Sequence, residues 1–233
     1  MTSVCLASYN GEKFISEQLN SILIQLEEND ELIVSDDGSE DNTIVLLKSY
    51  KDKRIKVIKN SGKKGPVGNF ENALNHAKGD YIFLADQDDI WLSGRVKNAI
   101  ELLKHKDIDC VICNRRIIDR YGNFMNEVVI SNDFTKKSFI KVLIHNPYIG
   151  CCMAFSRKHL DLALPFPKNL PMHDLWIGLL AHKLKTIAFI PEPLIGYRRH
   201  GENVTTGKSP YSLFYRLFYR VRLISQIYKR LHR

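Results

Sequence analysis

The chain has 233 residues, of which 44% are hydrophobic, and a formal net charge of +8. This size and composition are typical of one soluble globular domain with a short appendage and exclude disorder of the whole chain. No acidic residue follows Glu202 while seven lysines and arginines do, so the body is nearly neutral; this argues against a nucleic-acid-binding domain and for an anionic partner of the basic tail.

The first ten residues and the cysteines bear on the cellular compartment. MTSVCLASYN lacks the basic stretch and apolar run of a secretion signal, and no uncharged run approaches the roughly 18 residues of a membrane span. The five cysteines are therefore expected to be reduced thiols. A zinc site built from Cys110 and Cys113 with Cys151 and Cys152 is disfavoured, because CVIC lies in an apolar run and no second C-x-x-C follows. We expect a cytoplasmic protein.

Short apolar runs alternate with amphipathic stretches in the first half of the chain. The predicted strands are SVCLAS, ELIVS, IKVIKN and YIFLA, and the predicted helices span residues 15–26, 43–50, 67–77 and 96–104. This alternation predicts an α/β fold with a Rossmann-like, mostly parallel sheet and helices on both faces. In such sheets ligands bind beyond the carboxyl ends of the strands, which is where polar residues gather here.

The second half is predicted to be mixed α and β structure. DCVICN, CCMAFS and TIAFI are typical of strands, IIDRYGNF of a hairpin or turn, and residues 136–144 and HDLWIGLLAHKL of helices. Because no repeat or low-complexity linker interrupts it, we expect one domain over residues 1–205, with halves at 1–114 and 115–205, and an appendage over 206–233.

Two acidic clusters follow predicted strands. In SDDGS, Asp36 and Asp37 precede a glycine, a pattern typical of turns and helix caps as well as of ligand sites. In LADQDDIW, Asp86 and Asp88 at alternate positions can reach one hard cation, with Asp89 or water completing an oxygen shell. A helix N-terminus would also favour acids there, but three acids exceed what a cap needs.

The order of five short motifs resembles the inverting nucleotide-sugar glycosyltransferases of family 2, which have the GT-A fold. The motifs are SYN, SDDGS, DQDD, HDLW and YRRHG, and the resemblance covers roughly residues 1–205. DQDDIW, GPVGNF and HDLW are most similar to the branch that includes rhamnosyltransferases of bacterial capsule, O-antigen and other surface polysaccharides. The chain departs from the family at LASYN, where proline or threonine is commoner, so Ala7 is left with a backbone contact only.

The resemblance implies a nucleotide pocket at the strand ends. Ala7, Tyr9 and Asn10 would line the base pocket, with the Tyr9 ring available for stacking. Asp37, or its neighbour Asp36, would accept a hydrogen bond from the N3 imino group of uracil or thymine. This favours UDP or dTDP donors.

The segment NSGKKGPVGNFENAL is the expected diphosphate site. Backbone amides near Gly68 and Asn69 at a helix start, with Lys63 or Lys64, suit a diphosphate. An exposed loop with solvated lysines is the alternative.

The loop GYRRHGENVT has two interpretations. The resemblance implies a lid over the donor, with Arg199 on phosphate and His200 near the diphosphate or metal. The alternative is an exposed basic loop with no further role.

The resemblance also implies the catalytic groups. Asp86 and Asp88 would hold Mg²⁺ or Mn²⁺ against the donor diphosphate. Asp174, in HDLW, would be the general base for a single inverting displacement, unless it is only a buried or capping residue. The residues expected at the sugar or acceptor are Asp89, Trp91, His173 and Trp176.

The tail, SPYSLFYRLFYRVRLISQIYKRLHR, is predicted to be a basic amphipathic helix. Its apolar residues recur three and four apart at Phe214, Leu217, Phe218, Val221, Ile224, Tyr228 and Leu231. Such a helix can lie on an anionic membrane surface but cannot span it. The same pattern also suits packing on the body or on a second subunit in a homo-oligomer.

The sequence thus predicts a metal-dependent glycosyltransferase, peripheral at the inner face of the cell membrane. It would move rhamnose, galactose or a similar sugar from UDP or dTDP to a glycan or lipid-linked acceptor in surface polysaccharide synthesis. A nucleotidylyltransferase is disfavoured, because SYNGEKF is not a glycine-rich, arginine-containing phosphate loop. The other alternative is a non-catalytic, nucleotide-sugar-binding partner subunit of a glycan-assembly complex.

Overall fold

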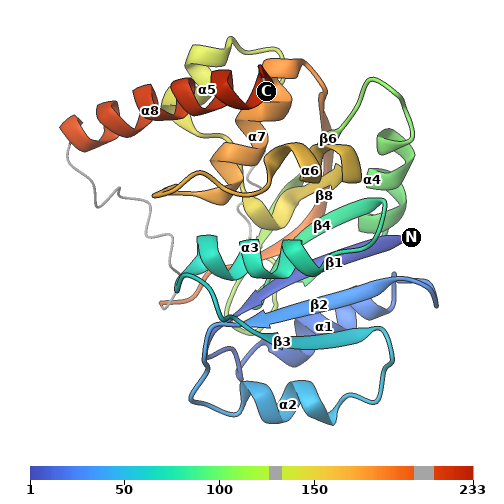
Figure 1. Cartoon of the computed structure of the whole chain (residues 1–233). Helices are drawn as coiled ribbons and strands as arrows, with labels where there is room; N and C mark the ends of the chain where they lie inside the picture. The colour runs from blue at the N-terminus through green and yellow to red at the C-terminus, as the bar shows by residue number, and fades with distance from the viewer. Residues whose placement is uncertain (126–132, 202–212, 233) are drawn as a thin grey trace.

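A single eight-stranded sheet organises the chain. The computed structural model describes residues 1–125, 133–201 and 213–232, the last range by its backbone alone up to residue 217. The strands run in the order β3-β2-β1-β4-β7-β6-β8-β5 (Figure 1). Their bounds are β1 Thr2–Ser8, β2 Glu31–Asp36, β3 Ile55–Lys59, β4 Tyr81–Asp86, β5 Ile90–Trp91, β6 Cys110–Ile118, β7 Met153–Ser156 and β8 Ile187–Arg198.

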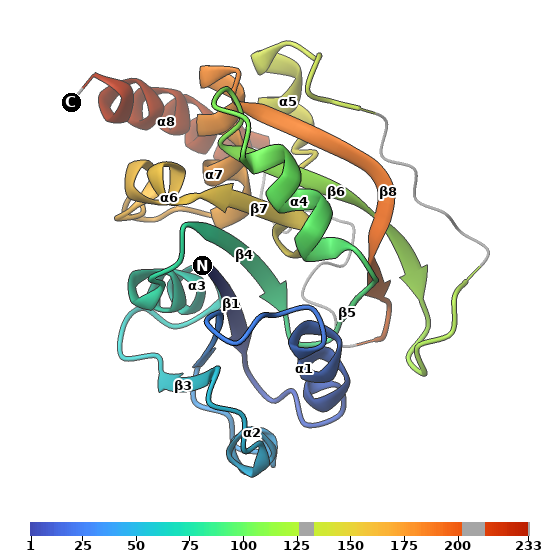
Figure 2. The ribbon, with the colours of Figure 1, turned by 90° about the vertical axis from the view of Figure 1, so that its right-hand side faces the viewer.

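Helices cover both faces of this sheet. Figure 2 shows α3 and α6 on one side and α1 and α4 on the other. The helix bounds are α1 Ile15–Leu23, α2 Thr43–Ser49, α3 Pro66–His76, α4 Arg95–Leu103, α5 Phe139–His145, α6 Arg157–Ala163, α7 His173–Leu184 and α8 Leu213–Leu231, with a short 3-10 turn at Gly150–Cys152. The predicted α/β class with helices on both faces is therefore confirmed.

The two halves of the sheet differ in strand direction. β1 pairs in parallel with both β2 and β4, and β2 with β3. β7 is antiparallel to β4 and β6, while β6 and β8 are parallel. The central strands are buried along nearly their whole length, as expected for a parallel sheet covered on both sides. The expectations of a parallel first half and a mixed second half both hold.

The last strand is longer than predicted. The sequence predicted a strand at TIAFI and a loop from Gly196, but β8 continues to Arg198. Pro191 and Pro193 obscured this, since proline is rare inside strands. Both prolines lie where the pairing of β6 with β8 shifts register near Asn114. The Asn114 side chain donates to the Pro191 carbonyl there. The two positions without an N–H group therefore fall where the hydrogen bonding between the strands is irregular.

The tail helix is docked on the body along one face. Leu223 and Ile227 are buried, and the Arg220 guanidinium donates to the carbonyl oxygens of Leu143 and Ile144 at the end of α5. Packing on the body, one of the two alternatives for the tail, is thus observed. Residues 202–205 of the predicted lid and residues 206–212 of the predicted appendage lie outside the described residues. No helix in the described part of the chain is both long and apolar enough to cross a bilayer.

Candidate active site

The ends of three neighbouring strands bring the polar motifs together. In the register of the sheet, Ala7 of β1 lies beside Asp86 of β4, and Ser8 lies beside Asp36 of β2. The N-terminus of α7, with Asp174, is close enough that its charge raises the pKa of Asp86. The predicted gathering of SYN, SDDGS and DQDD at neighbouring strand ends is therefore present in the fold, and HDLW lies close to them.

Asp36 is saturated with hydrogen bonds. Its Oδ1 accepts from the amides of Gly38 and Ser39 at 2.9 and 2.8 Å, and its Oδ2 accepts from the hydroxyls of Ser8 and Ser39 at 3.0 and 2.5 Å. These four bonds use the capacity of a carboxylate, which accepts about four. Asp36 therefore builds the turn after β2 and has no acceptor capacity left for the predicted contact with a nucleotide base.

Asp37 retains acceptor capacity. It is 9% exposed, and each oxygen accepts one hydrogen bond: Oδ1 from the Asn60 side chain and Oδ2 from the Gly65 amide, both at 2.7 Å. The Lys64 ammonium lies 3.6 Å from Oδ1 and donates to the Asp37 carbonyl. Asp37 thus ties the Asn60–Gly65 segment to the end of β2 and can still accept a bond from a ligand.

Gln87 fixes the loop after β1. Its side chain accepts a hydrogen bond from the Tyr9 amide at 2.8 Å and donates to the Tyr9 carbonyl at 2.9 Å. The Tyr9 ring is 54% exposed, as a stacking platform requires. Asn10 adopts a positive φ of 50° and accepts from the Glu40 amide, so its side chain holds the loop after β2. Sequence analysis assigned no role to Gln87.

Gly68 and Asn69 are buried beneath the segment that was predicted to bind diphosphate. A Cβ on Gly68 would lie 1.9 Å from the Lys63 carbonyl oxygen, so the chain folds back over the first turn of α3. The Asn69 side chain is 3% exposed and donates to the Ser8 carbonyl. These two residues hold α3 against β1, whereas Lys63 and Lys64 of the same segment are exposed.

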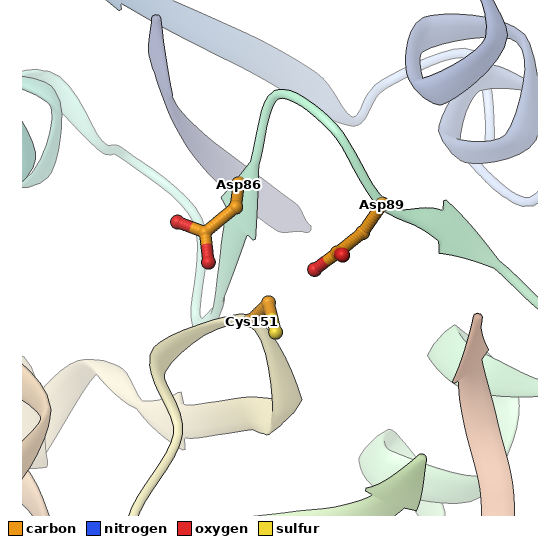
Figure 3. A group of neighbouring side chains, drawn as sticks. All are labelled: Asp86, Asp89 and Cys151. Carbon is orange, nitrogen blue, oxygen red and sulfur yellow. The ribbon is translucent and has the colours of Figure 1, made fainter. Parts of the chain in front are cut away.

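The acidic cluster after β4 is arranged around buried groups. Carboxylate oxygens of Asp86 and Asp89 and the thiol of Cys151 lie within 4.8 Å of one another (Figure 3). Asp89 is 1% exposed; its Oδ1 accepts from the Arg198 amide at 3.0 Å, while Oδ2 has no hydrogen-bond partner among the described residues. Cys151 was predicted only as a reduced thiol, and it is free and buried.

These carboxylates hold their protons unusually tightly. Burial, followed by the charges of Asp88 and Asp174, raises the pKa of Asp86 to about 7. Burial, with Asp88 and Asp86, also raises the pKa of Asp89 well above its ordinary value. Few donors and several like charges therefore meet at this point, unlike at Asp36.

The chemistry of this donor set fits a divalent cation. An orphaned buried carboxylate oxygen and mutually repelling acids are stabilised when a cation neutralises them. The residues that would hold it are Asp86 and Asp88, the predicted pair, with the Asp89 carboxylate and the Cys151 thiol close to Asp86. The predicted ligand His200 instead donates a 2.8 Å hydrogen bond from Nε2 to Asp88 Oδ2, and its ring lies 4.8 Å from that of Phe14.

Arg198 ties the acidic loop to the rest of the site. Its buried guanidinium donates to the Asp88 carbonyl at 2.6 Å and to Glu17 Oε2 at 2.5 Å, and it lies over the Phe14 ring. Arg198 was predicted to lie in an exposed basic loop, and the phosphate contact was assigned to Arg199, whose side chain is exposed. The sequence did not indicate this role, because Arg198 reaches its partners only when β8 continues past Gly196 to Arg198.

Asp174 lies in the first turn of α7 and is 7% exposed. Its Oδ1 accepts from the Leu175 amide at 2.6 Å, and burial raises its pKa to about 7. Its neighbour His173 stacks on Phe70 at 4.2 Å, and burial lowers the pKa of His173 to about 3, so the ring is neutral. A carboxylate with a pKa near 7 matches what a general base needs at neutral pH.

Two residues predicted to contact the sugar or acceptor are in the core. Trp176 has no exposed surface, and its Nε1 donates to the Ala163 carbonyl at 2.9 Å. Trp91 is 3% exposed and packs 5.5 Å from the Phe83 ring. The prediction was wrong for both, because the indoles face inward from α7 and β5 and fill hydrophobic space.

Comparison with known proteins agrees with this geometry. The model of the family described as Glycosyl transferase family 2 matches residues 3–162. WfgD of Escherichia coli, a UDP-Glc:alpha-D-GlcNAc-diphosphoundecaprenol beta-1,3-glucosyltransferase, is 32% identical over 77% of this chain and 70% of its own length. RfbG of Shigella flexneri, a dTDP-rhamnosyl transferase, is 35% identical over 47% of this chain and 40% of its own.

The fold has a counterpart of known structure. S. aureus TarS residues 1–349, solved in complex with UDP-GlcNAc, superposes with a TM-score of 0.75 at 20% identity over 97% of this chain and 66% of that chain. About two thirds of the solved TarS chain is thus spanned. The family model covers more than half of the sequence, and WfgD is 32% identical over 77% of this chain, so the chain belongs to glycosyl transferase family 2 and is a glycosyltransferase.

Proposed function

We propose that the protein transfers a sugar from UDP or dTDP to a hydroxyl of a lipid-linked acceptor in bacterial surface polysaccharide synthesis, with inversion at the anomeric carbon. The observation that carries this is the buried Asp174, whose pKa is raised to about 7 beside the acidic end of β4. A carboxylate in this state can remove a proton from an acceptor hydroxyl near neutral pH.

The donor preference rests on Asp37. Its two oxygens each retain room for another hydrogen bond, which suits the N3–H group of uracil or thymine. The Tyr9 ring is available for stacking on the base. In support, the relatives include a UDP-Glc transferase and a dTDP-rhamnosyl transferase.

The reaction is a single displacement. Asp174 takes the proton of the acceptor hydroxyl as that oxygen forms a bond to the anomeric carbon. The bond between this carbon and the diphosphate oxygen breaks on the opposite face, and the nucleoside diphosphate leaves. Mg²⁺ or Mn²⁺ held by Asp86 and Asp88 would neutralise charge on the leaving diphosphate. Asp89, locked by the Arg198 amide, would orient the donor sugar.

The acceptor class and location are inferred from relatives and from α8. WfgD acts on a diphosphoundecaprenol-linked sugar, as its name states. The face of α8 opposite to its docked side exposes Phe218, Val221, Ile224 and Tyr228 by 67, 60, 41 and 65%. A docked helix ordinarily turns polar residues outward, so this face suits the interfacial region of an anionic bilayer, reached from the cytoplasmic side.

Nucleotide titration tests the assignment. Calorimetry with UDP, dTDP, GDP and ADP, each with and without Mn²⁺, should give metal-dependent binding of UDP or dTDP that is lost in Asp88→Ala. Asp107→Ala, which removes an exposed acid elsewhere, is the matched control and should bind normally. Absence of binding for all four nucleotides would reject the donor assignment, and binding without turnover on any acceptor would favour a non-catalytic partner subunit.

Vesicle co-sedimentation tests the membrane surface. Val221→Ser with Tyr228→Ser should release the protein from vesicles containing phosphatidylglycerol. The control is Ile24→Ser, which removes an 85% exposed apolar side chain from the end of α1. Unchanged binding would reject this surface, and loss of a dimer in the double variant would assign the face to a second copy of the chain.

A further inference from the structure

A cavity of about 420 Å³ lies outside the acidic cleft, between the segment before α3, the segment before α7, and α8. Its lining includes Lys63, Lys64, Val67, Leu170, Phe218 and Arg222. The segment before α3 is more than 100 residues away in sequence from the other two parts of the chain that meet here. Only the docking of α8 on the body creates this space.

The charged residues that line the cavity are all cationic. Lys64 is already paired with Asp37. Arg222 donates one hydrogen bond, from Nη2 to the Lys168 carbonyl at 2.9 Å, and a guanidinium carries five N–H donors, so donors remain. Lys63 is exposed. Lys63 and Arg222 therefore offer positive charge and hydrogen-bond donors to an anion, and a guanidinium suits the paired oxygens of a phosphate group.

The part of α8 that lines the cavity is amphipathic, because Phe218 and Tyr219 lie beside Arg222. Phe218 both lines the cavity and is 67% exposed, and it belongs to the same outward face of α8 as Val221 and Tyr228. Phe218 thus lies both at the cationic cavity and on the apolar outer face of α8. A ligand that fits both parts has an anionic head and an apolar chain.

The cavity also adjoins the catalytic helix. Leu170 and Pro171 line it, and they precede His173 and Asp174 by only a few residues. A head group held by Lys63 and Arg222 would therefore stand near the N-terminus of α7, while its chain continued toward α8. This is the arrangement that an acceptor needs if its sugar hydroxyl is to reach Asp174.

We infer that this cavity binds the diphosphate of the lipid-linked acceptor, with the first part of the lipid chain on Phe218 and the outer face of α8. The inference rests on the proposed function for the identity of the acceptor. It gives Lys63 a role at the acceptor in place of the donor diphosphate, which the acidic cluster after β4 would hold through a divalent cation. The enzyme then has separate sites for its two diphosphates.

The test is binding of soluble amphiphiles to the full chain in the absence of donor. Geranyl diphosphate, inorganic pyrophosphate and geraniol separate the head group from the chain. We expect geranyl diphosphate to bind most tightly, and Arg222→Gln to weaken it about tenfold, the loss of one charge-assisted contact. Arg222→Lys should restore part of the affinity. Lys229→Gln, which removes an exposed cation of the same helix, is the control and should bind like the parent.

Three results would overturn the inference. Equal weakening by Lys229→Gln would mean that the helix attracts anions only through its general charge. If inorganic pyrophosphate bound as tightly as geranyl diphosphate, the lipid chain would make no contribution to binding. If geraniol bound as tightly as geranyl diphosphate, the diphosphate would make none. A melting temperature equal to that of the parent would show that Arg222→Gln is folded. Phe218→Ser is a second variant, which should weaken the binding of geranyl diphosphate but not that of pyrophosphate.

Failure of the proposed function has a different signature. UDP or dTDP binding with Mn²⁺ should be unchanged in Arg222→Gln, because Arg222 is not in the donor site. If no nucleotide binds while geranyl diphosphate still binds through Arg222, the result supports the acceptor site in the cavity and rejects the donor assignment. If nucleotides bind normally and geranyl diphosphate does not bind at all, the donor assignment stands and the cavity falls.

Discussion

The acidic pairs at the ends of β2 and β4 look alike in sequence and differ in the structure. Asp36 accepts four hydrogen bonds from its own turn and from β1. Asp86 and Asp89 lie among like charges with few donors, Asp89 Oδ2 has no partner among the described residues, and burial raises the pKa of both groups. A carboxylate whose hydrogen bonds are complete builds the fold, whereas one that lacks them is poised for a ligand or a proton.

The largest expected effect is on catalysis at Asp174. Asp174→Asn removes the group that takes the acceptor proton and should lower kcat about 10³-fold, within the range for general bases. UDP binding with Mn²⁺ should remain, because the proposed role of Asp174 is at the acceptor hydroxyl and not at the nucleotide. Steady-state rates together with calorimetry test this; an unchanged kcat would show that another residue is the base.

Asp36→Ala should instead damage the fold. Removing a buried carboxylate that accepts four hydrogen bonds leaves two amides and two hydroxyls without their partner, and we expect a loss of about 3 kcal/mol in the free energy of unfolding. Urea denaturation measures it. Asp86→Asn is the comparison and should not destabilise, since it relieves repulsion; equal destabilisation by both variants would erase the distinction between the two strand ends.

Asp37→Ala should weaken the nucleotide rather than the chemistry. Loss of one hydrogen bond to the base, together with a looser Asn60–Gly65 segment, should weaken UDP binding by about tenfold. Saturating donor should then restore a kcat near that of the parent. A kcat that stays low at saturation would place Asp37 in the reaction itself.

The smallest expected effect is the pH dependence. Asp174 acts as a base only when deprotonated, and its pKa is raised to about 7 by burial. The rate should therefore rise with pH and level off above about pH 8, and fall about fivefold between pH 7 and pH 6. A stopped or continuous assay at constant ionic strength measures the profile. A rate independent of pH between 6 and 8 would exclude a carboxylate with this pKa as the base.

The first half of the fold was predictable because its signals are local. Each strand is a short apolar run, each helix has its own periodicity, and the polar residues follow the strands directly. Trp91 and Trp176 show the limit of such reasoning, since an indole at a motif can face a ligand or the core equally well in sequence. Arg198 shows it too, because its partners Glu17 and Asp88 come from distant elements.

The tail helix shows the same limit most clearly. The sequence predicted its amphipathic pattern, but not that Leu223 and Ile227 face the body while Phe218 and Val221 face outward. When a helix carries apolar residues on two faces, its sequence does not determine which face packs on the body; the shape of the surface it docks on decides this.

The sequence by itself therefore determined the α/β class, the family and the acidic motifs, because these depend on residue type and spacing along the chain. Only the tertiary structure decided which carboxylates are saturated, which aromatic rings are buried and where a cationic cavity opens. Those properties depend on donors, like charges and packed surfaces contributed by segments that are far apart in sequence.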